Sequence, residues 1–269
     1  MFEMFRTDWY RLRRQKYLLV AVLLGLGMIV LTYMLSTLLT DPETVRAMQA
    51  QGADITAEDR TDAVVFAGYT LQQYMEQILF KGGFWISMMA VFSGVFCAED
   101  YTSGAVKNIF STLGSHWPYV VGRALCLLVY NAVLMAIFLL VPLALSPLLL
   151  FSSVGGTWLD WLQMYLSACL AGWAVSMCAL FLATLIRREG WMALVTLCVG
   201  TGLPAVLLGF ACQMLHLPDL TPFTICGCGR MITTDFRPVQ YLHIGAVCLG
   251  WVVVYGLLAG LSLTRRDQA

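Results

Sequence analysis

Charged residues are scarce in this chain of 269 residues. Lysine, arginine, aspartate and glutamate make up 12% of it, about half of what a soluble protein carries. Hydrophobic residues make up 59%, and the mean hydropathy is +0.77. The 16 basic and 16 acidic residues cancel, so nothing in the charge balance points to nucleic acid. The composition predicts an integral membrane protein with little soluble mass.

Several chemical motifs are also missing from the sequence. No Gly-x-x-x-x-Gly-Lys-Ser/Thr phosphate-binding loop occurs, so the chain is not expected to bind ATP in the P-loop manner. The three histidines form no spaced ligand set, and no Ser-His-Asp or Cys-His arrangement can be argued. The apolar stretches hold no relay of Asp, Glu and His of the kind that proton-driven transporters use. We therefore expect no catalytic residue, metal site or cofactor, which disfavours two alternatives, an ion-gradient-driven secondary transporter and an intramembrane enzyme.

Six long apolar stretches occupy most of the chain. They lie near residues 17–39, 84–98, 119–151, 162–186, 190–212 and 242–264. A helix needs roughly 20 residues to cross the hydrocarbon core of a bilayer. Five stretches reach that length, and the short second one is expected to borrow residues from the segment that ends at Lys81. The first stretch is too long for a signal peptide and has no small-residue cleavage site after it, so it should be retained. The predicted fold is all-α, with six transmembrane helices spread over residues 17–269.

Basic residues indicate the orientation of these helices. With the N-terminus inside, 11 of the 16 basic residues fall on the cytoplasmic side, including Arg13-Arg14, Arg187-Arg188 and Arg265-Arg266. The positive-inside rule therefore predicts that both termini are cytoplasmic.

Residues 1–16 are predicted to form an amphipathic helix in the membrane interface. Phe2, Phe5, Trp9 and Leu12 recur at spacings of three, four and three, with arginines in the other directions. An ordinary membrane anchor and a seat for a cytoplasmic partner both fit this pattern.

Residues 40–83 form the only sizeable polar segment between two apolar stretches, and it is acidic and predicted to be external. Asp41-Pro42 is typical of a helix start. Val64, Gly68, Leu71, Met75 and Ile78 predict a helix over about 62–80, ended by Gly82-Gly83. The segment is either a small cap over an exit path or a linker with one helix on the membrane surface.

The cytoplasmic segment 99–118 follows the second apolar stretch. Val106, Ile109, Phe110 and Leu113 share one helical face. Gly104 permits a sharp turn just before them. Glu99 and Asp100 lie at the inner boundary, where ionisable groups are paired or exposed to water. A short surface helix is predicted here, and a plain cytoplasmic loop is the alternative. The polar face of that helix is formed by Lys107, Asn108, Ser111 and Thr112.

This segment resembles the coupling region of the permeases of type-2 ATP-binding-cassette (ABC) exporters. The chain length, the order of six spans and the basic N-terminal helix also resemble that family. The positions that carry the resemblance are Glu99, Gly104, Lys107, Ile109, Phe110, Ser115 and Arg123. The external segment 40–83 departs from the family pattern and leaves the substrate open. In the family the segment holds a coupling helix that docks on a separate nucleotide-binding subunit. The residues that the resemblance assigns to this ATPase contact are Glu99, Asp100, Gly104, Lys107, Asn108, Ile109, Phe110 and Ser111.

The resemblance also implies an assembly and a cargo. Two permease subunits, as a homodimer or heterodimer, would pair with two P-loop ATPase subunits in the bacterial cytoplasmic membrane. They would export a hydrophobic or amphipathic substrate, such as a peptide antibiotic, a lipid or a drug-like molecule. Resistance to antimicrobial peptides is the role we expect, and this chain itself would not be an enzyme.

The external connection 213–241 carries the remaining signals. In the resembled family it often dips back into the membrane as short re-entrant helices. Cys212 could pair with Cys226 or Cys228, and the alternative is a metal bound by Cys226, Cys228 and His216. Two further patterns in the spans suggest bends and a close helix contact. They are Pro142, Pro147, Gly200, Gly202 and Pro204 for bends, and Gly256-x-x-x-Gly260 for the contact.

Overall fold

In the computed structural model, the chain is an all-helical bundle over its described residues, which are 6–7, 9–11, 16–51, 54–106, 116–146, 153–235 and 237–266. No β-strand occurs in these ranges. In chain order the helices are α2 Tyr17–Thr40, α3 Pro42–Ala50, α4 Ala57–Ala67, α5 Leu71–Met75, the π-helix η1 Glu76–Lys81, α6 Phe84–Thr102, α8 Trp117–Leu145, α9 Trp158–Ile186, α10 Glu189–Gly200, α11 Leu203–Met214, the 3-10 helix η2 Thr221–Phe223, α12 Ile225–Arg230 and α13 Pro238–Arg266.

Four helices are long and apolar enough to cross a membrane, namely α2, α8, α9 and α13. Two bent pairs pass the same test when each pair is taken together: Leu71–Lys81 with Phe84–Thr102, bent by 51°, and α10 with α11, bent by 48°. The second bend falls at Gly202, whose φ of +87° suits glycine, as the sequence predicted. The fold is thus that of a multi-pass membrane protein with four to six spanning helices.

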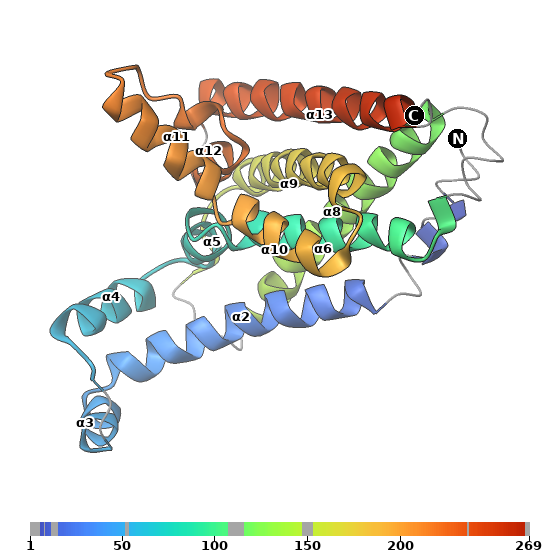
Figure 1. Ribbon diagram of the computed structural model, residues 1–269. Coiled ribbons are helices and arrows are strands. Elements are labelled where there is room, and N and C mark those ends of the chain that lie inside the picture. The colour runs from blue at the N-terminus through green and yellow to red at the C-terminus, as the bar shows by residue number, and fades with distance from the viewer. Residues whose placement is uncertain are drawn as a thin grey trace.

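The helices run back and forth between two ends of the bundle (Figure 1). At the first, here called the termini end, the last turns of α6, α9 and α13 meet the start of α8. Thr184 bonds to Ser262, and a Cβ on Gly260 would lie 2.7 Å from the Trp117 ring, so this glycine makes room for the indole. At the other, here called the hairpin end, the chain carries α3 and α4.

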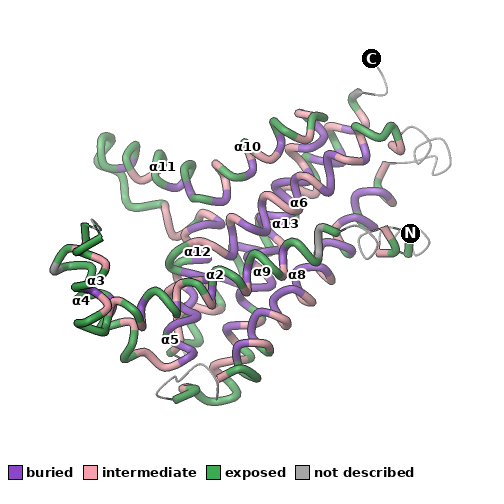
Figure 2. Tube along the Cα trace, turned by 90° about the horizontal axis from the view of Figure 1, so that it is seen from below, coloured by how far each residue is buried: buried purple, intermediate pink, exposed green. Residues whose placement is uncertain are grey.

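The centre of the bundle is α9, which packs against α6, α8 and α13. Its buried face is rich in Ala, Ser, Gly and Cys, and such small residues let helices approach closely. Gly172 is such a close contact, because a Cβ there would lie 2.1 Å from the Asn131 side-chain oxygen of α8. Figure 2 shows α9 running through the middle of the bundle, with exposed residues along α11 and over α3 and α4.

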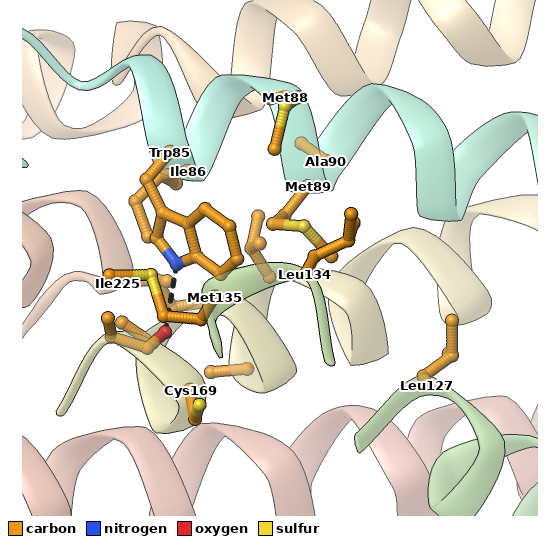
Figure 3. Packing of buried hydrophobic residues seen from close by; sticks show 14 of the residues in the cluster. Trp85, Ile86, Met88, Met89, Ala90, Leu127, Leu134, Met135, Cys169 and Ile225 are labelled. Atoms are coloured by element: carbon orange, nitrogen blue, oxygen red, sulfur yellow. Dashed lines mark hydrogen bonds between the residues drawn. The ribbon is translucent and has the colours of Figure 1, made fainter. Parts of the chain in front are cut away.

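Side chains of α6, α8 and α9 interlock in the core. The Trp85 ring turns from α6 into this cluster beside Met135, and its Nε1–H donates to the Ala168 carbonyl over 2.9 Å (Figure 3). One helical turn before Met135 on α8, Asn131 donates to the Ser176 hydroxyl over 3.1 Å, and Ser176 bonds to Ser93 over 2.7 Å. Interhelical hydrogen bonds of this kind hold membrane helices together, since lipid offers no hydrophobic gain between them.

The predicted helix over 62–80 is wrong, because the chain breaks between α4 and α5. Thr70 caps α5: its hydroxyl accepts the Gln73 N–H, and the Gln73 side chain accepts the Thr70 N–H. The Leu71 N–H donates to the Ser153 carbonyl over 3.0 Å, which fixes the start of α5 against a loop that is distant in sequence. The other two boundaries of this segment are confirmed. Asp41 caps α3, which begins at Pro42, and η1 ends at Lys81, before Gly82-Gly83.

Candidate coupling site

The last turn of α6 places a carboxylate where a carboxylate is unfavourable. Asp100 lies at the C-terminal end of the helix, where the backbone carbonyls already carry partial negative charge. Its side chain is completely buried. A buried carboxylate is stable only when cations and hydrogen-bond donors surround it. The prediction that an ionisable group here is paired or exposed to water is confirmed for Asp100, which is paired.

Arg123 supplies the first cation from the second turn of α8. Its Nη2 donates to the Asp100 Oδ2 over 2.6 Å and to the Phe96 carbonyl over 3.0 Å. The guanidinium carbon lies 3.9 Å from the centre of the Phe96 ring, in a cation–π contact. Tyr119, one turn earlier on α8, donates its hydroxyl to the same Oδ2 over 3.0 Å. Arg123 is buried as completely as Asp100.

Arg11 supplies the second cation from the N-terminal segment. Its Nη1 donates to the Asp100 Oδ1 over 2.6 Å, and its side chain is 25% exposed. Residues 6–7 and 9–11 are helical, which agrees with the predicted helix over residues 1–16 in the part that the structure describes. One carboxylate thus joins three segments of chain: the N-terminal segment, α6 and α8. We call the four side chains Arg11, Asp100, Tyr119 and Arg123 the Asp100 cluster.

The loop between α9 and α10 adds a fourth segment beside this cluster. Arg187 ends α9 in the left-handed conformation, with φ of 52°, and its guanidinium lies 5.6 Å from the centre of the Tyr101 ring. Thr102 donates its hydroxyl to the Glu189 carboxylate. The end of α6 is therefore held on several sides.

Immediately after α6 the chain turns sharply at Gly104, whose φ is +70°. A Cβ at this position would meet no neighbouring atom, so the glycine is required by the backbone conformation and not by space. The predicted turn is confirmed. The chain then leads into residues 107–115, which lie outside the described residues. The placements of Lys107, Asn108, Ile109, Phe110 and Ser111, and the coupling helix itself, therefore stay predictions.

Three of the predicted contact residues lie together at this exit. Glu99 is half-buried and Gly104 is exposed, so both present surface at the termini end. Asp100 differs, because its carboxylate is enclosed and its two oxygens are occupied by Arg11, Arg123 and Tyr119. Its position suits holding α6 in place better than touching a second protein.

Sequence reasoning did not identify Arg11, Tyr119 and Arg123 as partners of Asp100. The signal was present in Arg123, which lies about one turn inside an apolar stretch, where an arginine carries an insertion penalty. An acidic residue at the same end of the neighbouring span was the partner to look for.

The cysteines of the external connection are free thiols, as are all nine in the chain. Cys226 Sγ lies 3.2 Å from the Val199 carbonyl and Cys228 Sγ lies 3.3 Å from the Pro222 carbonyl, so neither is paired with Cys212. No group of three or more potential metal ligands is found across the described ranges. No protein-family model matches the chain, and no curated protein matches its sequence.

Proposed function

We propose that this chain is the membrane-spanning permease subunit of an ABC exporter, powered by ATP that a separate P-loop subunit hydrolyses. The observation that carries the proposal is the Asp100 cluster. It fixes the end of α6 to the N-terminal segment and to α8 at the point where the chain leaves the bundle towards residues 104–114. This is the segment whose residues resemble the coupling region of type-2 exporter permeases.

In this proposal the cluster transmits movement. A force applied to residues 104–114 reaches α6 within one turn of helix, through Gly104. Because Asp100 is bound to both Arg11 and Arg123, α6 cannot shift alone, and the N-terminal segment and α8 move with it as one body. Shifts at a small contact are passed on as rigid-body motions in this way because packed interfaces do not deform continuously.

The remaining features of the proposal follow from the resemblance and from the charge distribution. Arg187, Arg188 and Arg265 lie at the termini end, which supports a cytoplasmic position for that end in a bacterial membrane. Two permease copies and two ATPase copies would form the exporter, with the path between the permeases. The wide apolar surfaces suit a hydrophobic or amphipathic cargo, namely a peptide antibiotic, a lipid or a drug-like molecule, and resistance to antimicrobial peptides is the matching role.

Co-purification tests the central claim. The purified chain should show no ATPase activity, and adding its cognate P-loop subunit should give a complex of two permeases with two ATPases. Gly104→Pro, which proline's fixed negative φ makes incompatible with the turn, and Lys107→Glu should abolish coupled transport while the protein still inserts. Arg46→Glu, on α3 at the opposite end, is the matched charge-reversal control and should leave transport unchanged. Transport driven by an ion gradient without ATP would overturn the proposal.

A cysteine introduced at Asp54 tests the orientation. The position is exposed, at the hairpin end between α3 and α4. An impermeant thiol reagent should label it in whole cells. Labelling only after permeabilisation would reverse the topology.

A further inference from the structure

A cavity of about 640 Å³ lies between α11 and the α12 segment at the hairpin end of the bundle. Its walls are largely apolar and include Val206, Phe210, Leu217 and Met231. Two charged side chains also line it, Asp219 and Arg230. The volume is in the range of cavities that hold small organic ligands.

Arg230 is exposed and forms no ion pair or hydrogen bond with any residue that the structure describes. It ends α12, and its Nη2 would lie 3.3 Å from a Cβ on Gly202, so the guanidinium lies against the break between α10 and α11. This break leaves the carbonyl end of α10 near the cation, which is a favourable but weak interaction.

The carboxylates nearby are already engaged. Asp219 accepts the backbone N–H and the hydroxyl of Thr221, both at 2.9 Å. Glu76 binds Lys81 over 2.6 Å and accepts the Thr234 N–H over 2.7 Å. The cavity therefore holds a cation that forms no direct ion pair with any described residue, beside a carboxylate, Asp219, whose oxygens are bound by Thr221.

The segment that carries Arg230 dips alongside α13. The Pro222 carbonyl lies 3.2 Å from His243 Nε2, and the Trp251 Nε1–H donates to the Phe223 carbonyl over 2.8 Å. Pro222 lines the cavity, and its partner His243 lies about 8 Å along α13 from the start of the helix at Pro238. The cavity is thus beside the first turns of a spanning helix, where an arginine is costly unless water or an anion accompanies it.

The other wall of the cavity is open to acyl chains. On α11 the side chains of Val206, Leu207, Phe210 and Met214 are all more than half exposed. α11 packs weakly against the rest of the bundle, and exposed residues follow this helix (Figure 2). Val206 and Phe210 also line the cavity that holds the cation. A ligand that fills the cavity needs an anionic group for Arg230 and a hydrocarbon portion for α11.

We propose that this cavity binds an anionic membrane phospholipid, with its phosphate on Arg230 and an acyl chain along α11. Guanidinium groups hold phosphate through paired, charge-assisted hydrogen bonds. The bilayer supplies such molecules directly at the exposed face of α11. This assignment goes beyond the proposed function and does not depend on an ATPase partner.

Native mass spectrometry of the full chain in detergent micelles tests the assignment, with phosphatidylglycerol and phosphatidylcholine of identical acyl chains as probes. Phosphatidylglycerol should bind the native chain more tightly than phosphatidylcholine. Arg230→Gln should weaken phosphatidylglycerol binding by about tenfold or more, as expected when hydrogen bonds to a charged group are lost, and Arg230→Lys should recover part of it. Arg237→Gln is the matched control, because Arg237 is an exposed arginine of the same connection that pairs with Asp235 over 3.5 Å. This variant should bind lipid as the native chain does.

Further measurements distinguish the phospholipid from other occupants of the cavity. Gly209→Leu fills the cavity beside Thr221 while keeping Arg230, and it should also lose lipid binding. Equal binding of the two lipids, or unchanged binding by Arg230→Gln, would overturn the proposal. If inorganic phosphate competed as strongly as the lipid, the site would be a simple anion site and the lipid assignment would fail. A dimer that dissociates only in Arg230→Gln would instead assign the cavity to a second copy of the chain.

Discussion

The two ends of the bundle place an arginine in opposite surroundings. At the termini end Arg123 is fully enclosed and its charge is met by Asp100, an equally buried carboxylate. At the hairpin end Arg230 is exposed in a cavity and forms no ion pair with any described carboxylate. A buried ion pair fixes the elements that contribute to it, because separating them leaves a charge in a medium of low dielectric. An unanswered cation fixes nothing within the protein and is available to a ligand.

The same contrast holds for packing. At the termini end the Asp100 cluster and the α9–α10 loop hold α6 from several sides. At the hairpin end α11 leaves most of its apolar side chains exposed. We infer that the termini end moves as a unit, whereas the α11 side can rearrange around what it binds.

Breaking the Asp100 cluster should have the largest effect on stability. Asp100→Asn leaves Arg123 buried without its counter-charge, and such a loss costs about 3–5 kcal/mol. The free energy of unfolding in detergent measures it. The double variant Asp100→Leu/Arg123→Met removes both charges and should recover most of the loss. Equal stability of Asp100→Asn and the native chain would show that the cluster does not hold the termini end.

An intermediate effect is expected at Glu76, which links η1 to the external connection. Glu76→Gln keeps an acceptor for the Thr234 N–H but removes the charge that Lys81 faces. Lys81 is 43% exposed, so the loss should be no more than about 1 kcal/mol in the same unfolding measurement. Asp235→Asn, which removes an exposed pair on the same connection, serves as the reference and should change almost nothing. A loss as large as that of Asp100→Asn would erase the distinction between the two ends.

Arg230→Gln should leave stability within about 0.5 kcal/mol of the native value when no lipid is added, because no protein partner is lost. The free energies of unfolding of Arg230→Gln and Asp100→Asn, both in lipid-free detergent, measure the difference between the two arginine sites. A large destabilisation would mean that Arg230 has a structural role inside the protein.

The smallest effect concerns pH and is confined to α4 at the hairpin end. Hydrogen bonds from the Thr56 hydroxyl and then its backbone N–H hold the pKa of Asp59 below its ordinary value. A lowered folded-state pKa stabilises the cap above the unfolded pKa of about 3.9, and this stability is lost as the pH falls through the lower folded value. Amide exchange in the first turn of α4, corrected for intrinsic rates, should therefore quicken below about pH 4. Thr56→Ala removes the hydroxyl but keeps the backbone N–H, so it should weaken this pH dependence, and a profile unchanged by it would contradict the cap assignment.

Local features of the chain were predictable from the sequence because their causes are local. Runs of apolar residues predict the spanning helices, and glycines at positions 104 and 202 predict the turn and the break that their positive φ values now explain. The cap at Asp41 was equally visible.

Features that depend on distant contacts were not predictable from one sequence. The bond from Leu71 to Ser153 that holds the start of α5 joins distant residues, and Arg11 is 89 residues away from Asp100. The apolar period continues across the break before α5, and the local sign of that break was the capping pair Thr70 and Gln73. The absence of an ion pair at Arg230 within the described residues likewise depends on the fold, because Asp219 and Glu76 are bound by other groups.

The central position of α9 has a consequence for biogenesis. Helices α2, α6 and α8 leave the ribosome first, yet Trp85 and Asn131 find their partners Ala168 and Ser176 only on α9. Until residue 186 has been synthesised, these polar groups face lipid or the insertion machinery without those partners. The Asp100–Arg123 pair, in contrast, forms between consecutive spans and is complete before α9 appears. The order of synthesis therefore closes the termini end early and keeps the middle of the bundle open until α9 is inserted between its neighbours.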